Sequence, residues 1–374
     1  MQLKVKHFIF LIYCGFILRL LVAFWNGFFG PSPGADLDAQ GLYNYAVAVS
    51  QNLQFDEFRI GYWPYTNVLG AIFHFTVPSL FLGSVISCFA WLCSAHLLIK
   101  SLDIVGTTSR MKLNAVAFYV FYPSSILFTS VTLREPFQLL LLSLSIYTML
   151  KIYYQGNMLR FFPLIIYIGL MGVLHGAMLV TGIGIFGASL VLYAVRKNYK
   201  IPYLKILGYA AALVPLIIYL VSLTFSISYD LSDGLLIAAQ GYQEGAIAVG
   251  GRADYKSGIN LTSTFGLIWF AIFGFFQYLF EPFPWHVGSS LDLIVMLESV
   301  GRFYLILLIY KQFRVRDGSV DPGWLFVLLI FIVNEFVWSL GTVNWGTAMR
   351  HHVPASLCLL IVAFSFPSKK QWVR

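Results

Sequence analysis

Residues 8–25 read FIFLIYCGFILRLLVAFW, an apolar run interrupted by a single charged residue, Arg19. A helix needs about 20 consecutive apolar residues to cross the hydrocarbon core of a bilayer. Backbone groups must pair with one another in lipid, and no alternating strand pattern is present, so membrane spans in this chain are expected to be helices. Comparable runs lie near 80–99, 112–131, 135–153, 160–176, 178–195, 203–225, 291–310, 323–341 and 352–366.

The composition agrees with an all-α polytopic transmembrane bundle. Of the 374 residues, 59% are hydrophobic and 11% are charged, whereas soluble domains carry about 25% charged residues. A net charge of +8 in a soluble protein would suggest nucleic acid as a partner. Here Lys and Arg cluster at the ends of the apolar runs, which indicates orientation in a lipid bilayer instead. All four cysteines lie inside apolar runs without Cys/His metal-ligand spacing, so no disulfide framework and no cysteine-based metal site is predicted.

The basic clusters also predict the topology. If they are all cytoplasmic, as the positive-inside rule requires, both termini are cytoplasmic. This arrangement has about 10–12 membrane segments, with 66–79 and 264–280 predicted to be re-entrant or interfacial. We predict one domain, 1–374, with outer loops near 27–64, 226–263, 281–290 and 342–351.

The first outer loop contains Asp36 and Asp38, followed by a pattern over 40–51, which includes Tyr43 and predicts a short amphipathic helix on the membrane surface. An Asp at this point is a common helix N-cap. A carboxylate here is also suited to act as a general base for an acceptor hydroxyl or to hold a divalent metal ion. The sequence does not decide between a helix cap, a general base and a metal ligand.

Arg134 and Glu135 stand side by side in a predicted turn between two apolar helices. A carboxylate at a helix N-terminus is stabilised by the helix dipole, which is a structural reason for Glu135. Ionisable residues are costly at membrane depth, however, and mark functional sites by default. Arg134 can clamp a phosphate by bidentate hydrogen bonds, and Glu135 can orient the phosphate or the acceptor.

Three further outer segments carry polar candidates. Arg350 and His351 lie in a turn predicted to face outward, against the positive-inside pattern, which suggests that Arg350 binds an anion. Arg252 follows two glycines in the third loop, where exposed amides can cradle an anion or simply be solvated. His286, in the aromatic 281–290 turn, is placed to contact a sugar or to anchor at the interface.

The remaining buried charges are expected to be mainly structural. Glu298 and Arg302 stand four residues apart in a predicted span, which favours an ion pair between them. Arg19 lies in the middle of the first helix and is expected to need an anionic partner. Glu335 is likewise expected to be mainly structural.

Cations and carboxylates at a lipid–water boundary suit a lipid-linked phosphate that bears a leaving group. The cations would neutralise charge on the departing phosphate, and a carboxylate would deprotonate the attacking hydroxyl. The sequence has no nucleotide-binding loop, no GxSxG nucleophile elbow and no HExxH helix.

These segments resemble the GT-C superfamily of membrane glycosyltransferases and related bacterial polysaccharide polymerases. The resemblance rests on Leu18-Arg19-Leu20 followed by Asp38 and Tyr43, on 61–65 and 122–126, on Thr132-Leu-Arg134-Glu135, and on 344–351 before a final span. It implies a GT-C-like bundle in which Asp38 is the leading base, Asp36 the alternate and Glu135 a second acidic site residue. The resemblance further implies a polyprenyl-phosphate-linked sugar donor and an active face outside the cytoplasmic (inner) membrane.

Two departures from the family bear on the acceptor. Asp36-Leu-Asp38 replaces the Asp-Glu pair of the protein mannosyltransferases, and no C-terminal soluble domain is seen. A glycan or glycolipid acceptor, in cell-surface polysaccharide or exopolysaccharide biosynthesis, is therefore expected rather than a protein. The alternatives are a repeat-unit polymerase and a non-enzymatic transporter or flippase of lipid-linked sugars. No cofactor is firmly predicted, although a divalent metal ion is compatible with the carboxylates.

Overall fold

The computed structural model describes residues 5–32, 36–53, 61–197, 253–254, 264–315 and 320–365, together with isolated residues between 208 and 248. Within these residues the regular secondary structure is helical apart from a single β-bridge between Asp254 and Asn344. The helices are α1 (Val5–Phe28), α2 (Asp36–Asn52), α3 (Trp63–Phe75), α4 (Leu80–Ile104), α5 (Ser109–Phe121), α6 (Pro123–Phe128), α7 (Glu135–Gln155), α8 (Phe161–Leu174), α9 (Gly176–Lys197), α12 (Thr264–Trp269), α13 (Phe275–Phe280), α14 (Ser290–Val315), α15 (Pro322–Gly341) and α16 (Trp345–Phe364).

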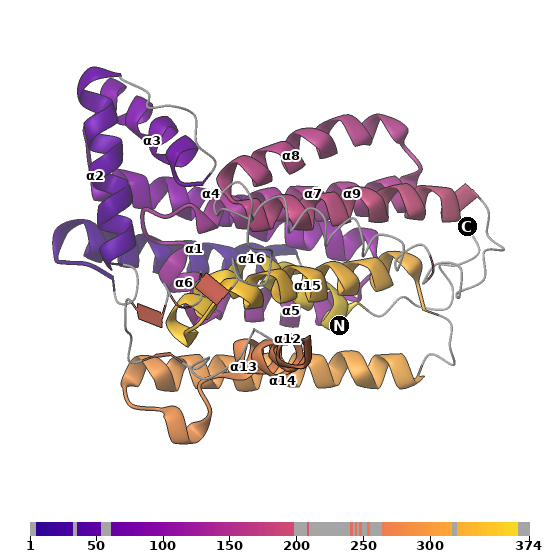
Figure 1. The fold of residues 1–374 in the computed structure, drawn as a ribbon. Coiled ribbons are helices and arrows are strands. Elements are labelled where there is room, and N and C mark those ends of the chain that lie inside the picture. Colours follow the sequence, from indigo (N-terminus) through magenta and orange to yellow (C-terminus); the bar gives the residue numbers. More distant parts are fainter. Residues whose placement is uncertain are drawn as a thin grey trace.

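Seven of the described helices are long and apolar enough to cross a membrane, which confirms a multi-pass helical membrane protein. They are α1, α4, α7, α9, α14, α15 and α16, and they run along one common direction in Figure 1. Large apolar side chains on the outside of α1 and α14 are exposed, among them Phe10, Leu21 and Leu297. Such a surface fits lipid contact rather than water.

Two of the predicted spans fold differently, and a third is not tested. The run 112–131 forms two short helices, α5 and α6, because Pro123 forces Tyr122 into an extended conformation with φ −68° and ψ 112°. The run 160–176 becomes α8, preceded by the 3-10 turn η1 (Met158–Arg160), and Met158–Leu174 is shorter than the seven spans. The run 203–225 lies outside the described residues apart from the isolated Gly208.

The two ambiguous apolar stretches fold into short helices. Residues 66–79 fall largely in α3, which has 13 residues and is too short to span a bilayer alone. Residues 264–280 form α12, the π-helical η2 (Phe270–Gly274) and α13. Both shapes are compatible with the predicted re-entrant or interfacial placement, which stays a prediction.

The first outer loop contains the predicted surface helix, but it begins earlier than expected. α2 starts at Asp36, four residues before Gln40. In Figure 1, α2 stands across one end of the bundle, at a steep angle to the long helices, with α3 beside it. The first turn of α2 places Asp38 at the end of the bundle at which α7 and α16 begin.

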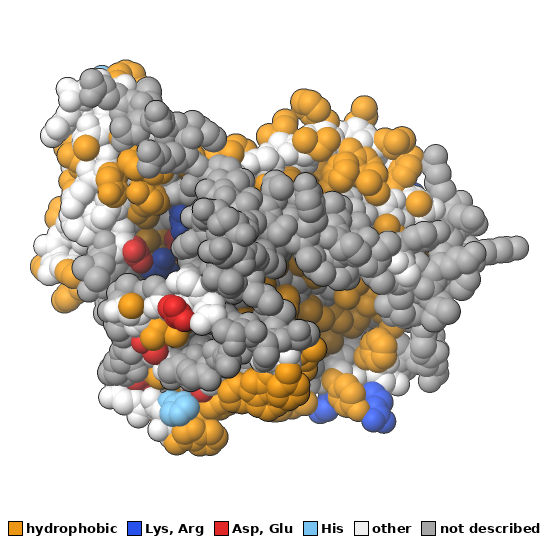
Figure 2. Space-filling model, viewed as in Figure 1, with side chains coloured by type: hydrophobic (Ala, Val, Ile, Leu, Met, Phe, Trp, Pro, Cys, Tyr) orange, Lys and Arg blue, Asp and Glu red, His pale blue; other side chains and the backbone are white. Residues whose placement is uncertain are grey.

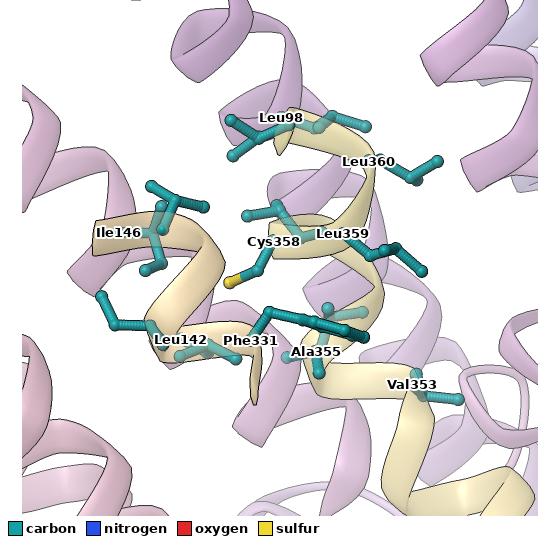
Figure 3. Packing of buried hydrophobic residues seen from close by; sticks show 14 of the residues in the cluster. Leu98, Leu142, Ile146, Phe331, Val353, Ala355, Cys358, Leu359 and Leu360 are labelled. Carbon is teal, nitrogen blue, oxygen red and sulfur yellow. The ribbon is translucent and has the colours of Figure 1, made fainter. Parts of the chain in front are cut away.

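α16 is the central helix of the core. Figure 3 shows Val353, Cys358 and Leu360 of α16 among side chains from three other helices: Leu98 of α4, Leu142 and Ile146 of α7, and Phe331 of α15. These residues are almost completely buried. Close packing on several sides fixes α16, and therefore the polar residues near its N-terminus, relative to α7.

The buried Arg19 has neutral partners, so the expectation of an anionic partner is wrong. Its guanidinium donates to Thr129 Oγ1 at 2.8 Å, to Ser125 Oγ at 3.0 Å and to two backbone carbonyls, and it lies 3.5 Å from the centre of the Trp91 ring. Hydroxyls, carbonyls and an aromatic face together satisfy this cation and tie α1 to α4, α5 and α6.

The predicted Glu298–Arg302 ion pair is likewise not formed. Glu298 accepts hydrogen bonds from the backbone N–H and the hydroxyl of Ser124. Arg302 donates to the carbonyl of Leu279 and, at 3.1 Å, to the hydroxyl of Tyr122. The break between α5 and α6 supplies Tyr122 and Ser124, and α13 supplies the carbonyl of Leu279. Neither is visible in the spacing of the two charged residues.

Candidate functional site

Arg350 links the first outer loop to the start of α7. One terminal nitrogen of its guanidinium, Nη1, pairs with Asp38 Oδ2, and the other, Nη2, lies 3.2 Å from Glu135 Oε1. The Asp38 side chain is 58% exposed, whereas that of Glu135 is 3% exposed. The structure therefore brings together three candidates that are far apart in the sequence, with one carboxylate open to the surroundings and one buried.

Local backbone geometry places the members of this trio. The Asn344 side chain caps α16 by accepting from Thr347 N–H at 2.7 Å, so Arg350 falls within the first two turns of the helix. Glu135 is the first residue of α7, and Pro136 after it suits this position because its missing N–H is not needed there. Both helices begin at the same end of the bundle.

Asp38 is not the helix cap that one interpretation of the sequence gave, because it is the third residue of α2. This leaves its exposed carboxylate for Arg350. Asp36 is the first residue of α2, and its side chain lies outside the described part of the chain. Tyr43 is half-buried and packs edge-on against Phe73 at 5.8 Å between ring centres, so it joins α2 to α3 rather than the trio.

Arg134 and His351 belong to a second cluster beside the trio, built around Trp338 of α15. His351 stacks on the Trp338 ring at 3.8 Å between centres, and His175 lies at 4.5 Å from the same ring. Arg134 donates to the carbonyl of Leu174 at 3.3 Å, next to His175. His351 also hydrogen-bonds Thr342 Oγ1 at 2.9 Å. A guanidinium thus adjoins two imidazoles at the end of α8.

We expect His175 to make stability depend on pH. Burial, reinforced by the positive charge of Arg134, lowers the pKa of His175 from 6.5 to about 3. Its folded-state pKa is lower than its unfolded one, so its contribution is complete above pH 6.5 and is lost as the pH falls toward 3. In this window the free energy of unfolding should decline by up to ~1.4 kcal/mol per pH unit.

The variant His175→Asn isolates this contribution, because Asn can still accept the Ala177 N–H bond that His175 Nδ1 accepts at 3.1 Å. Unfolding of the detergent-solubilised protein at pH 4.5 to 7.5 should show a shallower slope for the variant. Parallel slopes for the two proteins would contradict the assignment.

His286 forms a separate dyad with Glu281, a residue the sequence did not single out as functional. His286 Nδ1 lies 2.8 Å from Glu281 Oε2, which also accepts from Phe283 N–H at 2.9 Å. The Glu281 side chain is 1% exposed and that of His286 is 43% exposed. His286 lies parallel to Trp345, the first residue of α16, at 6.3 Å between ring centres. The dyad therefore lies at the α16 end that carries Arg350.

Two more polar residues at this end were missed by the sequence reasoning. Asp292 is buried and accepts from Trp345 Nε1 at 2.9 Å. Gln138, one turn after Glu135, is 1% exposed, and neither atom of its amide has a hydrogen-bond partner among the described residues. Glu135 Oε2 and Arg350 Nε share this condition. The available signal was that Asp292 and Gln138 are polar residues inside the predicted apolar runs 291–310 and 135–153. A polar side chain in such a run is notable because buried polar groups normally need partners.

Arg252 lies outside the described residues, so its predicted anion contact is not located. The neighbouring Ala253 accepts from Trp345 N–H at 3.1 Å, and Asp254 bridges to Asn344, so this part of the third loop reaches the start of α16. Among the described residues, no group of three or more His, Cys, Asp or Glu side chains is arranged to hold a metal ion.

Figure 2 shows acidic and basic side chains together in a hollow of the surface beside the α2–α3 end of the molecule. Further acidic side chains and a histidine lie below this hollow and basic side chains lie at the lower right, while apolar side chains cover much of the remaining described surface. An anionic or polar head group would find its partners at this end, whereas its apolar portion would remain beside the apolar bundle.

Comparisons of the chain with protein-family models, with curated proteins and with solved structures found no match.

Proposed function

We propose that the chain is a GT-C-type membrane glycosyltransferase that transfers a sugar or glycan from a polyprenyl-(pyro)phosphate donor to a glycolipid or polysaccharide acceptor. The reaction would take place on the periplasmic or extracellular face of the cytoplasmic membrane, in cell-surface polysaccharide biosynthesis. The observation that carries the proposal is the ion-paired trio of Asp38, Glu135 and Arg350 at one end of a membrane bundle.

Charge and exposure assign different roles to the two carboxylates. Each terminal nitrogen of Arg350 holds one carboxylate, so we expect a phosphate that binds the same edge of the guanidinium to replace the more accessible partner. Asp38 is the exposed partner and is expected to leave, while the buried Glu135 keeps the guanidinium in place. The phosphate takes the place of one carboxylate beside Arg350 and retains charge-assisted hydrogen bonds to the guanidinium.

The released Asp38 carboxylate then acts as the general base. The acceptor hydroxyl oxygen forms a bond to the anomeric carbon and its proton passes to Asp38, while the bond from that carbon to the phosphate oxygen breaks. The electron pair leaves with the phosphate, where Arg350 and, beside it, Arg134 stabilise the charge. Transfer of a single sugar and of a repeat unit would follow the same steps.

Reconstituted vesicles test the donor class. The purified chain is incubated with a glycolipid acceptor and a panel of radiolabelled donors, either polyprenyl-phosphate sugars, polyprenyl-pyrophosphate glycans or nucleotide sugars. Labelled product is expected only from a polyprenyl-linked donor, and product length distinguishes single transfer from polymerisation. Product from nucleotide sugars alone, or movement of the lipid-linked sugar across the bilayer without transfer, would contradict the proposal.

A further inference from the structure

A cavity of about 420 Å³ lies inside the bundle between α5, α14, α15 and α16. Its volume is within the range of small-molecule sites, about 300–1,000 Å³. Phe118, Phe121 and Leu297 line it, and these side chains are 37%, 50% and 59% exposed. Since α14 is long and apolar enough to span a membrane, exposed apolar side chains at this edge face lipid, and the cavity can be entered from the bilayer.

Four ionisable side chains also line this apolar cavity: Glu298, Arg302, Glu335 and His352. Each is at most 4% exposed. Glu335 Oε2 pairs with His352 Nδ1, and His352 Nε2 lies 3.1 Å from the carbonyl of Tyr278. The other carboxylate oxygen, Glu335 Oε1, is buried without a hydrogen-bond partner among the described residues. A buried acceptor without a partner is unfavourable, so a ligand that donates a hydrogen bond here would be stabilised.

The charges around the cavity define the kind of head group. Arg302 and His352 already donate to neighbouring groups, so the position left open is the acceptor Glu335 Oε1, and a fully ionised phosphate head group has no donor to offer it. An ammonium group would have to lose its hydration at membrane depth, which is expensive. A hydroxyl group carries no net charge and is cheaper to bury, and it supplies the donor that Glu335 Oε1 lacks.

We propose that this cavity binds a long-chain alcohol of the bilayer, with its hydroxyl group donating to Glu335 Oε1 and its hydrocarbon chain lying against the apolar walls. The site is separate from the Asp38–Glu135–Arg350 trio and does not depend on the proposed glycosyl transfer.

Photolabelling of the purified protein in lipid nanodiscs tests the proposal. The probes are a long-chain alcohol with a diazirine in its chain, the methyl ether of that alcohol and its phosphate ester. The alcohol should label peptides of α5 and α14 roughly tenfold more than the ether, because the ether leaves the buried acceptor unpaired. Equal labelling by the ether, or stronger labelling by the phosphate ester, would overturn the proposal.

Gly301 gives a variant that fills the cavity. It lines the cavity, and a Cβ added there would meet no atom within 4 Å, so Gly301→Leu should fold and reduce labelling by the alcohol at least fivefold. Gly169→Leu is the matched control, since a Cβ at Gly169 of α8 also meets no atom within 4 Å and Gly169 does not line the cavity. Unchanged labelling of folded Gly301→Leu would also overturn the proposal.

If Gly301→Leu does not fold, Glu335→Gln tests the proposed contact between Glu335 and the hydroxyl group. The neutral amide can keep a hydrogen bond to His352, but it can also donate to an ether oxygen. The preference for the alcohol over the ether should therefore fall to about twofold or less. If the variant keeps the full preference for the alcohol over the ether, Glu335 does not bind the hydroxyl group, and the proposal is wrong.

Discussion

Asp38→Asn is expected to reduce glycosyl transfer by roughly 10²- to 10⁴-fold, the contribution typical of a general base. Asn has the shape of Asp and can still accept a hydrogen bond from Arg350, but it cannot take up the proton of the acceptor hydroxyl. Because the Asp38 side chain is 58% exposed, losing its charge should change stability little. The measurement is product formation in reconstituted vesicles with a saturating lipid-linked donor.

Asp103→Asn is the matched control for this variant. Asp103 is also a partly exposed carboxylate, with a side chain 47% exposed, and it pairs with Lys112 at 2.5 Å. It does not contact the trio in the described structure, so transfer by Asp103→Asn should equal that of the unmodified protein. Full activity of folded Asp38→Asn would show that Asp38 is not the base, whatever the donor.

Arg350→Ala is expected both to abolish transfer and to destabilise the protein by roughly 3–5 kcal/mol, because it leaves the Glu135 carboxylate buried without its cation. Arg350→Lys should lose less stability, yet it cannot reproduce the two-pronged contact with Asp38 and Glu135. Thermal unfolding in detergent and donor binding to the folded protein measure the two effects separately.

The double variant Arg350→Ala/Glu135→Gln separates stability from function. Without the buried charge, the second substitution should recover most of the lost stability, whereas donor binding and transfer should remain absent. A double variant as unstable as Arg350→Ala alone would mean that Glu135 is not the reason for the destabilisation. Recovery of donor binding together with stability would mean that Arg350 does not bind the phosphate.

Local patterns in the sequence determined the class of fold. Apolar runs of spanning length predict membrane helices because lipid offers no hydrogen-bond partners to the backbone, and 8–25, 80–99 and 323–341 form such helices. Apolarity predicts one span over 112–131, but two short helices form there, because hydropathy does not detect the break that Pro123 introduces. Hydropathy reports only which environment a segment prefers, and backbone restrictions decide whether it stays one helix.

The sequence also nominated Asp38, Glu135 and Arg350, because charged residues are costly in a chain that is 11% charged. It did not reveal that Arg350 holds both carboxylates, since α2, α7 and α16 meet only through tertiary packing. For the same reason the sequence predicted an anionic partner for Arg19 and an ion pair between Glu298 and Arg302, and the described structure has neither contact. Charge indicates that a buried group needs partners, but the folded arrangement of hydroxyls, carbonyls and rings decides which partners it finds.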